Sequence, residues 1–95
     1  MLFTIYALDK PEGLPTRLAN YEAHKAFLQT SSEHGVRIVM SGPLVQDDGE
    51  TMKGSLFLIE APDRATVEAF NRADPFYAAG LWETINIVAF LRRVG

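Results

Sequence analysis

The stretch that decides the fold is "VRIVMSGPLVQDDGETMKGSLFLIEA", residues 36–61. Two largely apolar runs, 36–44 and 55–61, lie on either side of a polar, turn-rich segment. This pattern predicts two strands joined by a hairpin loop. Gly42-Pro43 is expected to end the first strand, because proline cannot donate to a sheet ladder.

A strand and a helix are predicted before this hairpin. Residues 2–8 are mostly β-branched, aromatic and apolar, and the loop "DKPEGLP" follows them. Thr16 is then expected to cap a helix that runs to about residue 32 or 33, with Gly35 at its C-cap. At 100° per residue, an apolar stripe along this helix contains Leu18, Tyr21 and Leu28.

Helices and a last strand are predicted after the hairpin. Asp63 is expected to cap a helix that reaches about Arg72. Asp74-Pro75 is expected to begin a short further helix, closed by Gly80. The run "ETINIVAFL", residues 83–91, is expected to be the last strand.

The resulting order is β-α-β-β-α-β, which is the ferredoxin-like α+β arrangement. It predicts a four-stranded antiparallel sheet with the helices on one face. A chain of 95 residues has room for one domain, taken here as residues 1–95.

Both faces of the predicted sheet are apolar, although helices would cover only one. Alternation along the last strand sets Ile85 and Ile87 against Val88 and Phe90. The other strands show the same pattern, with Phe57 and Ile59 against Leu56 and Leu58, and Ile38 and Met40 against Val39. A homodimer through the open sheet face, as in a dimeric α+β barrel, would cover the second face. The alternative is that only the middle of that face is apolar.

Composition excludes several classes of site. With 9 basic and 12 acidic residues, no basic patch for nucleic acid stands out. The absence of cysteine excludes disulfides, thiolate zinc sites and a cysteine nucleophile. No spacing typical of metal ligands and no glycine-rich phosphate loop is present, so neither metal nor cofactor is expected. No apolar run reaches the roughly 18 residues of a membrane span and no signal peptide is evident, so we expect a cytoplasmic protein.

His24 is a candidate for proton transfer. It falls within about 60° of the apolar stripe of its helix, and Arg17, seven residues earlier, within about 20° of it. A histidine near neutrality can act as acid or base if a pocket reaches it. The alternative is a core histidine whose ring nitrogens are satisfied by neighbours, which periodicity alone favours.

Asp74 also has two interpretations. An aspartate before proline is a good helix N-cap. A carboxylate near His24 would also fix the tautomer of the imidazole, and a carboxylate has two oxygens, so that one could cap while the other orients the ring.

A third group of candidates would contact a ligand. Ser41 is expected to end the second strand just before Gly42 and Pro43, where a hydroxyl and exposed backbone N–H groups could bind an anionic or carbonyl oxygen. Phe76 could supply an apolar wall. The alternatives are a plain strand end and a plain core aromatic.

These residues resemble the YciI-like (YCII-related) family over nearly the whole chain. The resemblance is carried by the helix "RLANYEAHKAFLQTSSEHG", the segment "SGPL" and the segment "KGSLFLIEAPDRATVEAFNRADPFYAAGLWETINI". It implies a dimeric α+β barrel and an active site on the pair His24 and Asp74. It also implies roles for Arg17 and for residues 41–43. One branch of the family acts as a dehydrochlorinase, and most members have no assigned reaction.

We therefore expect a small, cofactor-independent enzyme that uses His24 and Asp74 for acid/base chemistry on a small molecule, of the lyase, isomerase or dehydrochlorinase kind. Two alternatives stay open. One is a non-catalytic metabolite-binding or regulatory dimer, and the other is a structural dimer in which the pair only satisfies buried groups.

Overall fold

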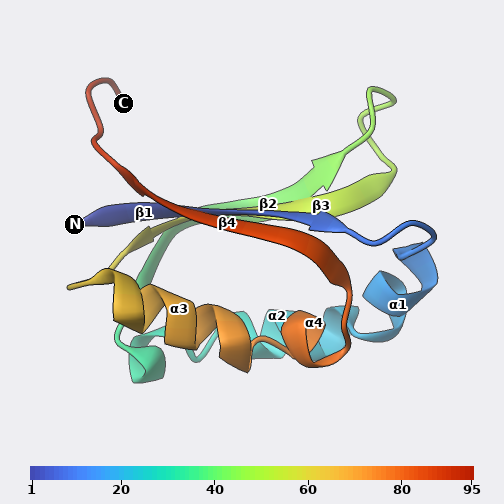
Figure 1. Ribbon diagram of the computed structural model, residues 1–95, viewed down its shortest axis with the longest axis horizontal. Helices are drawn as coiled ribbons and strands as arrows, with labels where there is room; N and C mark the ends of the chain where they lie inside the picture. Colours follow the sequence, from blue (N-terminus) through green and yellow to red (C-terminus); the bar gives the residue numbers. More distant parts are fainter.

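A four-stranded antiparallel sheet with the strand order β2-β3-β1-β4 lies over one layer of helices in the computed structural model, which describes residues 1–95 (Figure 1). The elements are β1 (Leu2–Asp9), α1 (Leu14–Ala19), α2 (Tyr21–Leu28), the 3-10 helix η1 (Ser31–His34), β2 (Arg37–Val45), β3 (Met52–Glu60), α3 (Arg64–Ala73), α4 (Pro75–Ala78) and β4 (Trp82–Phe90). The predicted ferredoxin-like α+β fold is confirmed. No helix has the length and apolar character needed to cross a membrane.

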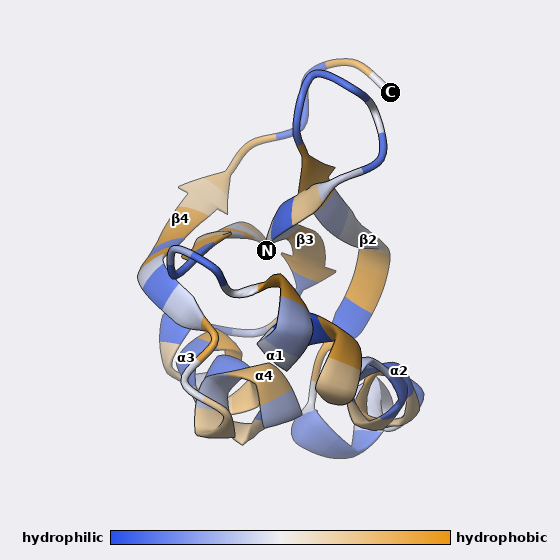
Figure 2. Cartoon of the chain, turned by 90° about the vertical axis from the view of Figure 1, so that its right-hand side faces the viewer, coloured by the Kyte–Doolittle hydropathy of each residue, from blue (hydrophilic) through white to orange (hydrophobic).

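The core lies between the sheet and the helices. Alternate residues of the central strands point toward the helices, so Phe3 and Ile5 of β1 and Phe57 of β3 are buried between the sheet and the helices. The helix α3 adds Val67 and Phe70, both fully buried, as its 3.6-residue period predicts. Viewed from the end, α2 lies below the β2 edge and α3 below the β4 edge (Figure 2).

The single helix predicted from Thr16 is broken into separate pieces. The helix α1 begins at Leu14, with Gly13 as the N-cap and no side-chain cap, so the assignment of Thr16 as the cap was wrong. Asn20 interrupts the helix with φ −110° and ψ 6°, and its side-chain amide donates to the Thr16 carbonyl at 2.9 Å. Asparagine competes for backbone partners in this way, which explains the break.

The break changes which side chains of α1 face the core. Leu18, predicted in the apolar stripe, is exposed, whereas its neighbour Arg17 is only 2% exposed. The predicted stripe assumed one continuous helix. Because the helix breaks at Asn20, the residues before and after the break do not follow a single 3.6-residue period.

The strand β2 does not end at Gly42-Pro43, as was predicted, but continues to Val45. Pro43 pairs with Ser55 of β3 within the ladder. Because β2 is an edge strand, a proline there can turn its missing N–H side toward solvent without cost to the sheet.

A bulge in β2 reverses the predicted alternation. Ile38 pairs with Ile59, but Met40 pairs with Leu58, so Val39 is the extra residue. The prediction that Ile38 and Met40 share a face was therefore wrong. The bulge moves Met40 to the open face and turns Ser41, opposite Phe57, toward the helices.

The open face is apolar, as the alternation predicted. Its exposed large apolar side chains come from all four strands, and they are Tyr6, Met40, Leu56, Val88 and Phe90.

Candidate active site

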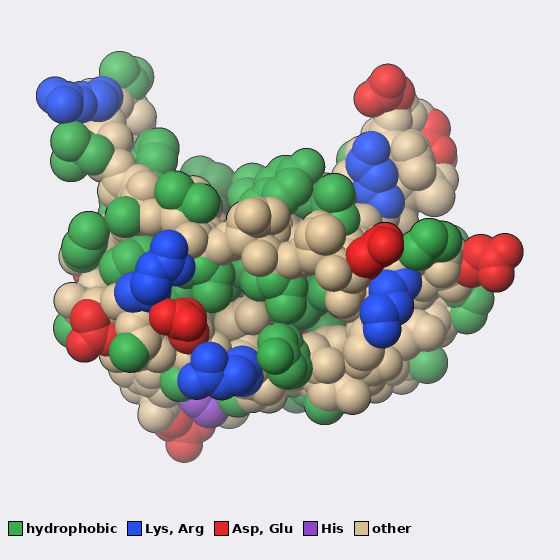
Figure 3. Space-filling model, viewed as in Figure 1, with side chains coloured by type: hydrophobic (Ala, Val, Ile, Leu, Met, Phe, Trp, Pro, Cys, Tyr) green, Lys and Arg blue, Asp and Glu red, His purple; other side chains and the backbone are tan.

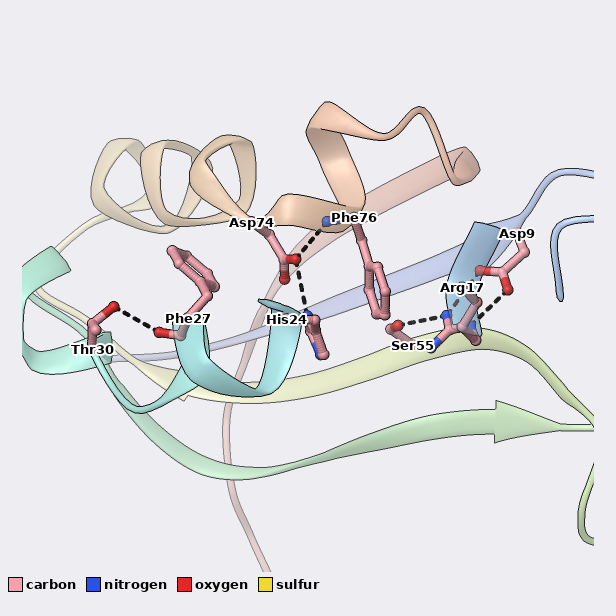
Figure 4. Close-up of polar contacts among 8 residues, drawn as sticks. All are labelled: Asp9, Arg17, His24, Phe27, Thr30, Ser55, Asp74 and Phe76. Carbon is pink, nitrogen blue, oxygen red and sulfur yellow. Dashed lines mark hydrogen bonds and ion pairs between the residues drawn. The ribbon is translucent and has the colours of Figure 1, made fainter. Parts of the chain in front are cut away.

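A histidine–carboxylate pair lies between the helices. His24 comes from α2, and Asp74 is the residue that joins α3 to α4. His24 Nδ1 lies 2.9 Å from Asp74 Oδ1 (Figure 4). Asp74 is 1% exposed and His24 8%, so the contact is sheltered from water.

Asp74 uses one oxygen for both of its contacts. The N–H of Phe76 donates to Oδ1 at 2.9 Å, which is the N-cap bond of α4. The same oxygen faces His24 Nδ1, and the buried Oδ2 has no hydrogen-bond partner. The predicted cap is therefore present, but the expectation that separate oxygens cap the helix and orient the ring was wrong.

Phe76 supports the ring of His24. The two rings stack with centroids 4.1 Å apart and planes 15° apart. The guanidinium carbon of Arg17 lies 4.8 Å from the centroid of the Phe76 ring, and Figure 4 shows Phe76 between His24 and Arg17. Phe76 is fully buried and does not line the pocket described below. Its geometry suits it to position His24 and Arg17.

Arg17 is held by a buried ion pair at the end of β1. Its Nε donates to Asp9 Oδ2 at 2.8 Å, and its Nη2 donates to Asp9 Oδ1 and to Ser55 Oγ, each at 2.9 Å. Such a bidentate pair fixes the guanidinium plane. The charge of Arg17 is therefore largely balanced by Asp9, and its Nη1 is left without a protein acceptor.

Of these residues, Arg17, His24 and Ser55 line one pocket, which has a volume of about 220 Å³. Drug-sized ligands occupy pockets of about 300–1,000 Å³, so this one suits a smaller molecule. Its walls come from α1, α2, β2 and β3, and they are formed by Arg17, Tyr21, His24, Lys25, Leu28, Ser41, Gly42, Pro43, Ser55 and Phe57. The structure thus brings Arg17, His24 and the predicted segment 41–43 together around one space.

Several residues of the site could not be singled out from the sequence. The loop after β1 was predicted, but the contact that it allows between Asp9 and Arg17 was not, because it depends on how the loop places α1 against the end of β1. Ser55 was predicted only as part of a strand. Its pairing with Pro43 in the sheet places both residues on the face that lines the pocket. Lys25 also lines the pocket, where its ammonium contacts Glu22 at 3.0 Å and lies 5.2 Å from the Tyr21 ring.

No group of three or more histidine, cysteine or acidic residues is arranged to hold a metal ion.

The chain belongs to the YCII-related family, because the YCII-related domain matches residues 1–91. It is 34% identical over 95 residues to Protein YciI of Escherichia coli O6:H1 (strain CFT073), covering 95% of this chain and 96% of that protein. Protein YciI of Shigella flexneri matches to the same extent. The predicted family is confirmed.

A solved structure of an enzyme is also similar. It is the 5-chloro-2-hydroxyhydroquinone dehydrochlorinase TftG from Burkholderia phenoliruptrix AC1100, in complex with 2,5-dihydroxybenzoquinone. That protein is 34% identical to this chain, with a TM-score of 0.86, and the match covers 98% of this chain and 96% of that one. A likeness in fold alone extends to a putative antibiotic biosynthesis monooxygenase from Bacteriodes thetaiotaomicron, at 15% identity and a TM-score of 0.57 over 99% of this chain and 90% of that one.

Proposed function

We propose that this chain is a small enzyme that transfers protons on a small, hydroxylated ring compound, with His24 as general acid and base. The observation that carries the proposal is the 2.9 Å contact between His24 Nδ1 and buried Asp74 Oδ1, made by a histidine that also lines the pocket. A carboxylate at Nδ1 favours the tautomer that carries its proton there. The lone pair of Nε2 is then available to accept a proton from a ligand.

Arg17, Lys25 and Ser41 supply the polar part of the pocket wall. The free Nη1 of Arg17 and the ammonium of Lys25 favour an anionic oxygen such as a phenolate. Because Asp9 already balances Arg17, we assign Arg17 the role of directing an oxygen and not of binding a full negative charge. Leu28 and Phe57 provide apolar walls for a ring.

The class of reaction follows from the similar dehydrochlorinase. Loss of HCl from a chlorinated hydroxyhydroquinone needs a hydroxyl proton to move to the carbon that bears chlorine. Chloride then leaves while a second hydroxyl loses its proton, and a hydroxyquinone remains. No external oxidant is consumed, since the ring is oxidised as the carbon–chlorine bond is lost. One histidine that accepts and then returns a proton is suited to both steps.

We also propose that the functional unit is a homodimer that covers the open sheet face. Exposed apolar side chains from every strand of the sheet support it, because soluble monomers rarely leave such a patch uncovered. The pocket lies on the helix side of the same sheet and would stay open in this dimer.

The test compares His24→Ala with His34→Ala, since these are the two histidines of the chain. His34 packs against Phe27 and Phe70 away from the pocket, so its removal controls for the loss of a ring. Chloride release from 5-chloro-2-hydroxyhydroquinone is followed with an ion-selective electrode, and binding of 2,5-dihydroxybenzoquinone by calorimetry. Removal of a general acid/base lowers rates by about 10² to 10⁴-fold.

We expect the rate of chloride release to fall by this factor in His24→Ala and to stay unchanged in His34→Ala. Binding of the quinone to His24→Ala should be retained within about tenfold, or 1.4 kcal/mol. Binding without chloride release in the wild type would overturn the catalytic proposal and favour a metabolite-binding module. Equal rates of chloride release in His24→Ala and His34→Ala would show that His24 does not act in the reaction.

A further inference from the structure

The open face of the sheet is hollowed between two projections that carry opposite charge (Figure 3). One projection is the C-terminal tail beyond β4, which contains Arg92 and Arg93. The other is the loop between β2 and β3, which contains Asp47, Asp48 and Glu50. Figures 1 and 3 place them at opposite ends of the long axis, with apolar side chains between them.

The acidic loop has a fixed shape. Asp48 accepts hydrogen bonds from the backbone N–H groups of Glu50 and Thr51, each at 2.9 Å, and from the Thr51 hydroxyl. Asp47 and Glu50 accept no hydrogen bond within the chain and are exposed. The loop therefore presents unpaired carboxylates beside the hollow face.

A second copy can cover this face in two ways that keep two-fold symmetry. If the axis runs along the long direction of the face, each tail meets the partner's tail and each loop meets the partner's loop. If the axis crosses the long direction, each tail meets the partner's loop. Only the second arrangement pairs opposite charges, and symmetry forms that contact twice.

We propose that the homodimer adopts this second, antiparallel arrangement, in which the Arg92–Arg93 tail of each protomer contacts the acidic loop of the other. The apolar face supplies most of the affinity, since exposed ion pairs contribute little. The charges select the orientation, because the alternative places like charges together at both ends. This inference rests on the homodimer proposed above and is independent of the reaction.

The absence of cysteine makes disulfide trapping a direct test, because any introduced thiol is the only one present. Val94→Cys places a thiol in the exposed tail, and Glu50→Cys places one in the loop while Asp47 and Asp48 remain. With diamide as oxidant, the antiparallel dimer predicts that an equal mixture of the two variants cross-links at least about tenfold faster than either alone.

Charge reversal supplies the second measurement. Arg92→Glu with Arg93→Glu is expected to raise the dimer dissociation constant about tenfold at low salt, measured by analytical ultracentrifugation. Asp47→Lys with Glu50→Lys is expected to do the same, and all four changes together to restore the wild-type value. Reversal of Glu33 and Arg72, exposed on the helix side, is the matched control and is expected to have no effect.

The outcomes separate the proposals. Cross-linking of Val94→Cys alone, or a combined variant that stays weak, would overturn the antiparallel arrangement. A wild type that sediments as a monomer would overturn the dimer as well. Neither result bears on chloride release, so a failure of this inference is distinguishable from a failure of the proposed reaction.

Discussion

At the scale of single residues, one carboxylate oxygen of the site makes two polar contacts. Asp74 Oδ1 caps α4 and faces His24, while Oδ2 is buried without a partner. The sequence predicted each role of Asp74 from its place before Pro75 and from the helix face of His24. It could not predict that both use one oxygen, because that depends on the angle between α2 and α4.

The capping role and the orienting role of Asp74 can be separated. In Asp74→Asn the amide oxygen still caps α4, because asparagine is as good an N-cap as aspartate. The carboxylate charge beside the His24 ring is lost, so we expect turnover to fall about 10²-fold or more. Because the cap is retained, folding stability is expected to change by less than about 1 kcal/mol, the typical cost of losing an N-cap. Chloride release and urea unfolding measure the two quantities.

The matched control is Asp63→Asn, which changes the N-cap of α3, where Asp63 accepts from the Thr66 N–H at 2.9 Å. It should leave turnover unchanged. Nitrogen-15 spectra of the His24 ring should show a proton on Nδ1 in the wild type and a mixed tautomer in Asp74→Asn. Turnover that is unchanged in Asp74→Asn would mean that the charge of Asp74 is not used in the reaction.

At the scale of the elements, the predictions were right where the periodicity of a helix or strand continued without a break. They were wrong where a helix break or a β-bulge interrupted it. Strands and helices were placed correctly in order because apolar alternation and caps such as Asp63 are local signals. The break at Asn20 comes from a local hydrogen bond that periodicity does not register, whereas the bulge at Val39 depends on how β2 pairs with β3, and both affect the pocket. Without the bulge, Ser41 would face away from His24.

The β2–β3 loop gives a prediction about pH. Hydrogen bonds from the Thr51 hydroxyl, then from the Thr51 and Glu50 backbone, lower the pKa of Asp48 from 3.8 to about 2. A carboxyl whose pKa is lower in the folded state stabilises that state above its unfolded pKa, and this contribution is lost as the pH falls through the folded pKa. Asp48→Ala should therefore be less stable than the wild type by a constant amount above about pH 5. The difference should shrink between about pH 4 and pH 2.

Urea unfolding at a series of pH values measures this difference. Asp47→Ala is the matched control, because Asp47 lies in the same loop and accepts no hydrogen bond in the chain. A stability difference for Asp48→Ala that stays constant down to pH 2 would show that its carboxylate does not hold the loop.

At the scale of the whole molecule, the sheet separates two surfaces of different character. The helix side holds the pocket, and the open side presents the exposed apolar residues. Strand alternation alone predicted an apolar open face, because it requires only that successive residues point to opposite sides. The opposite charges at its ends were not predicted, since they depend on how far the tail and the loop project.

A single change on the open face tests whether a second copy covers it. Val88 of the edge strand β4 is 56% exposed in the isolated chain and pairs with Thr4 of β1, on the open face. Val88→Glu should cost the monomer little, because the carboxylate reaches water. In the dimer it would be buried without a partner, and a desolvated charge of this kind costs about 2–5 kcal/mol. We expect the dimer dissociation constant to rise by about 30-fold or more.

Leu18→Glu is the matched control, because Leu18 is 57% exposed but lies on α1, in the helix layer. Sedimentation at several concentrations should then show a monomer for Val88→Glu at concentrations where the wild type and Leu18→Glu are dimers. Circular dichroism should show the same fold in all of them, which separates loss of the interface from loss of the structure. If Val88→Glu and Leu18→Glu had equal effects on assembly, the open face would not be the surface through which copies of this chain associate.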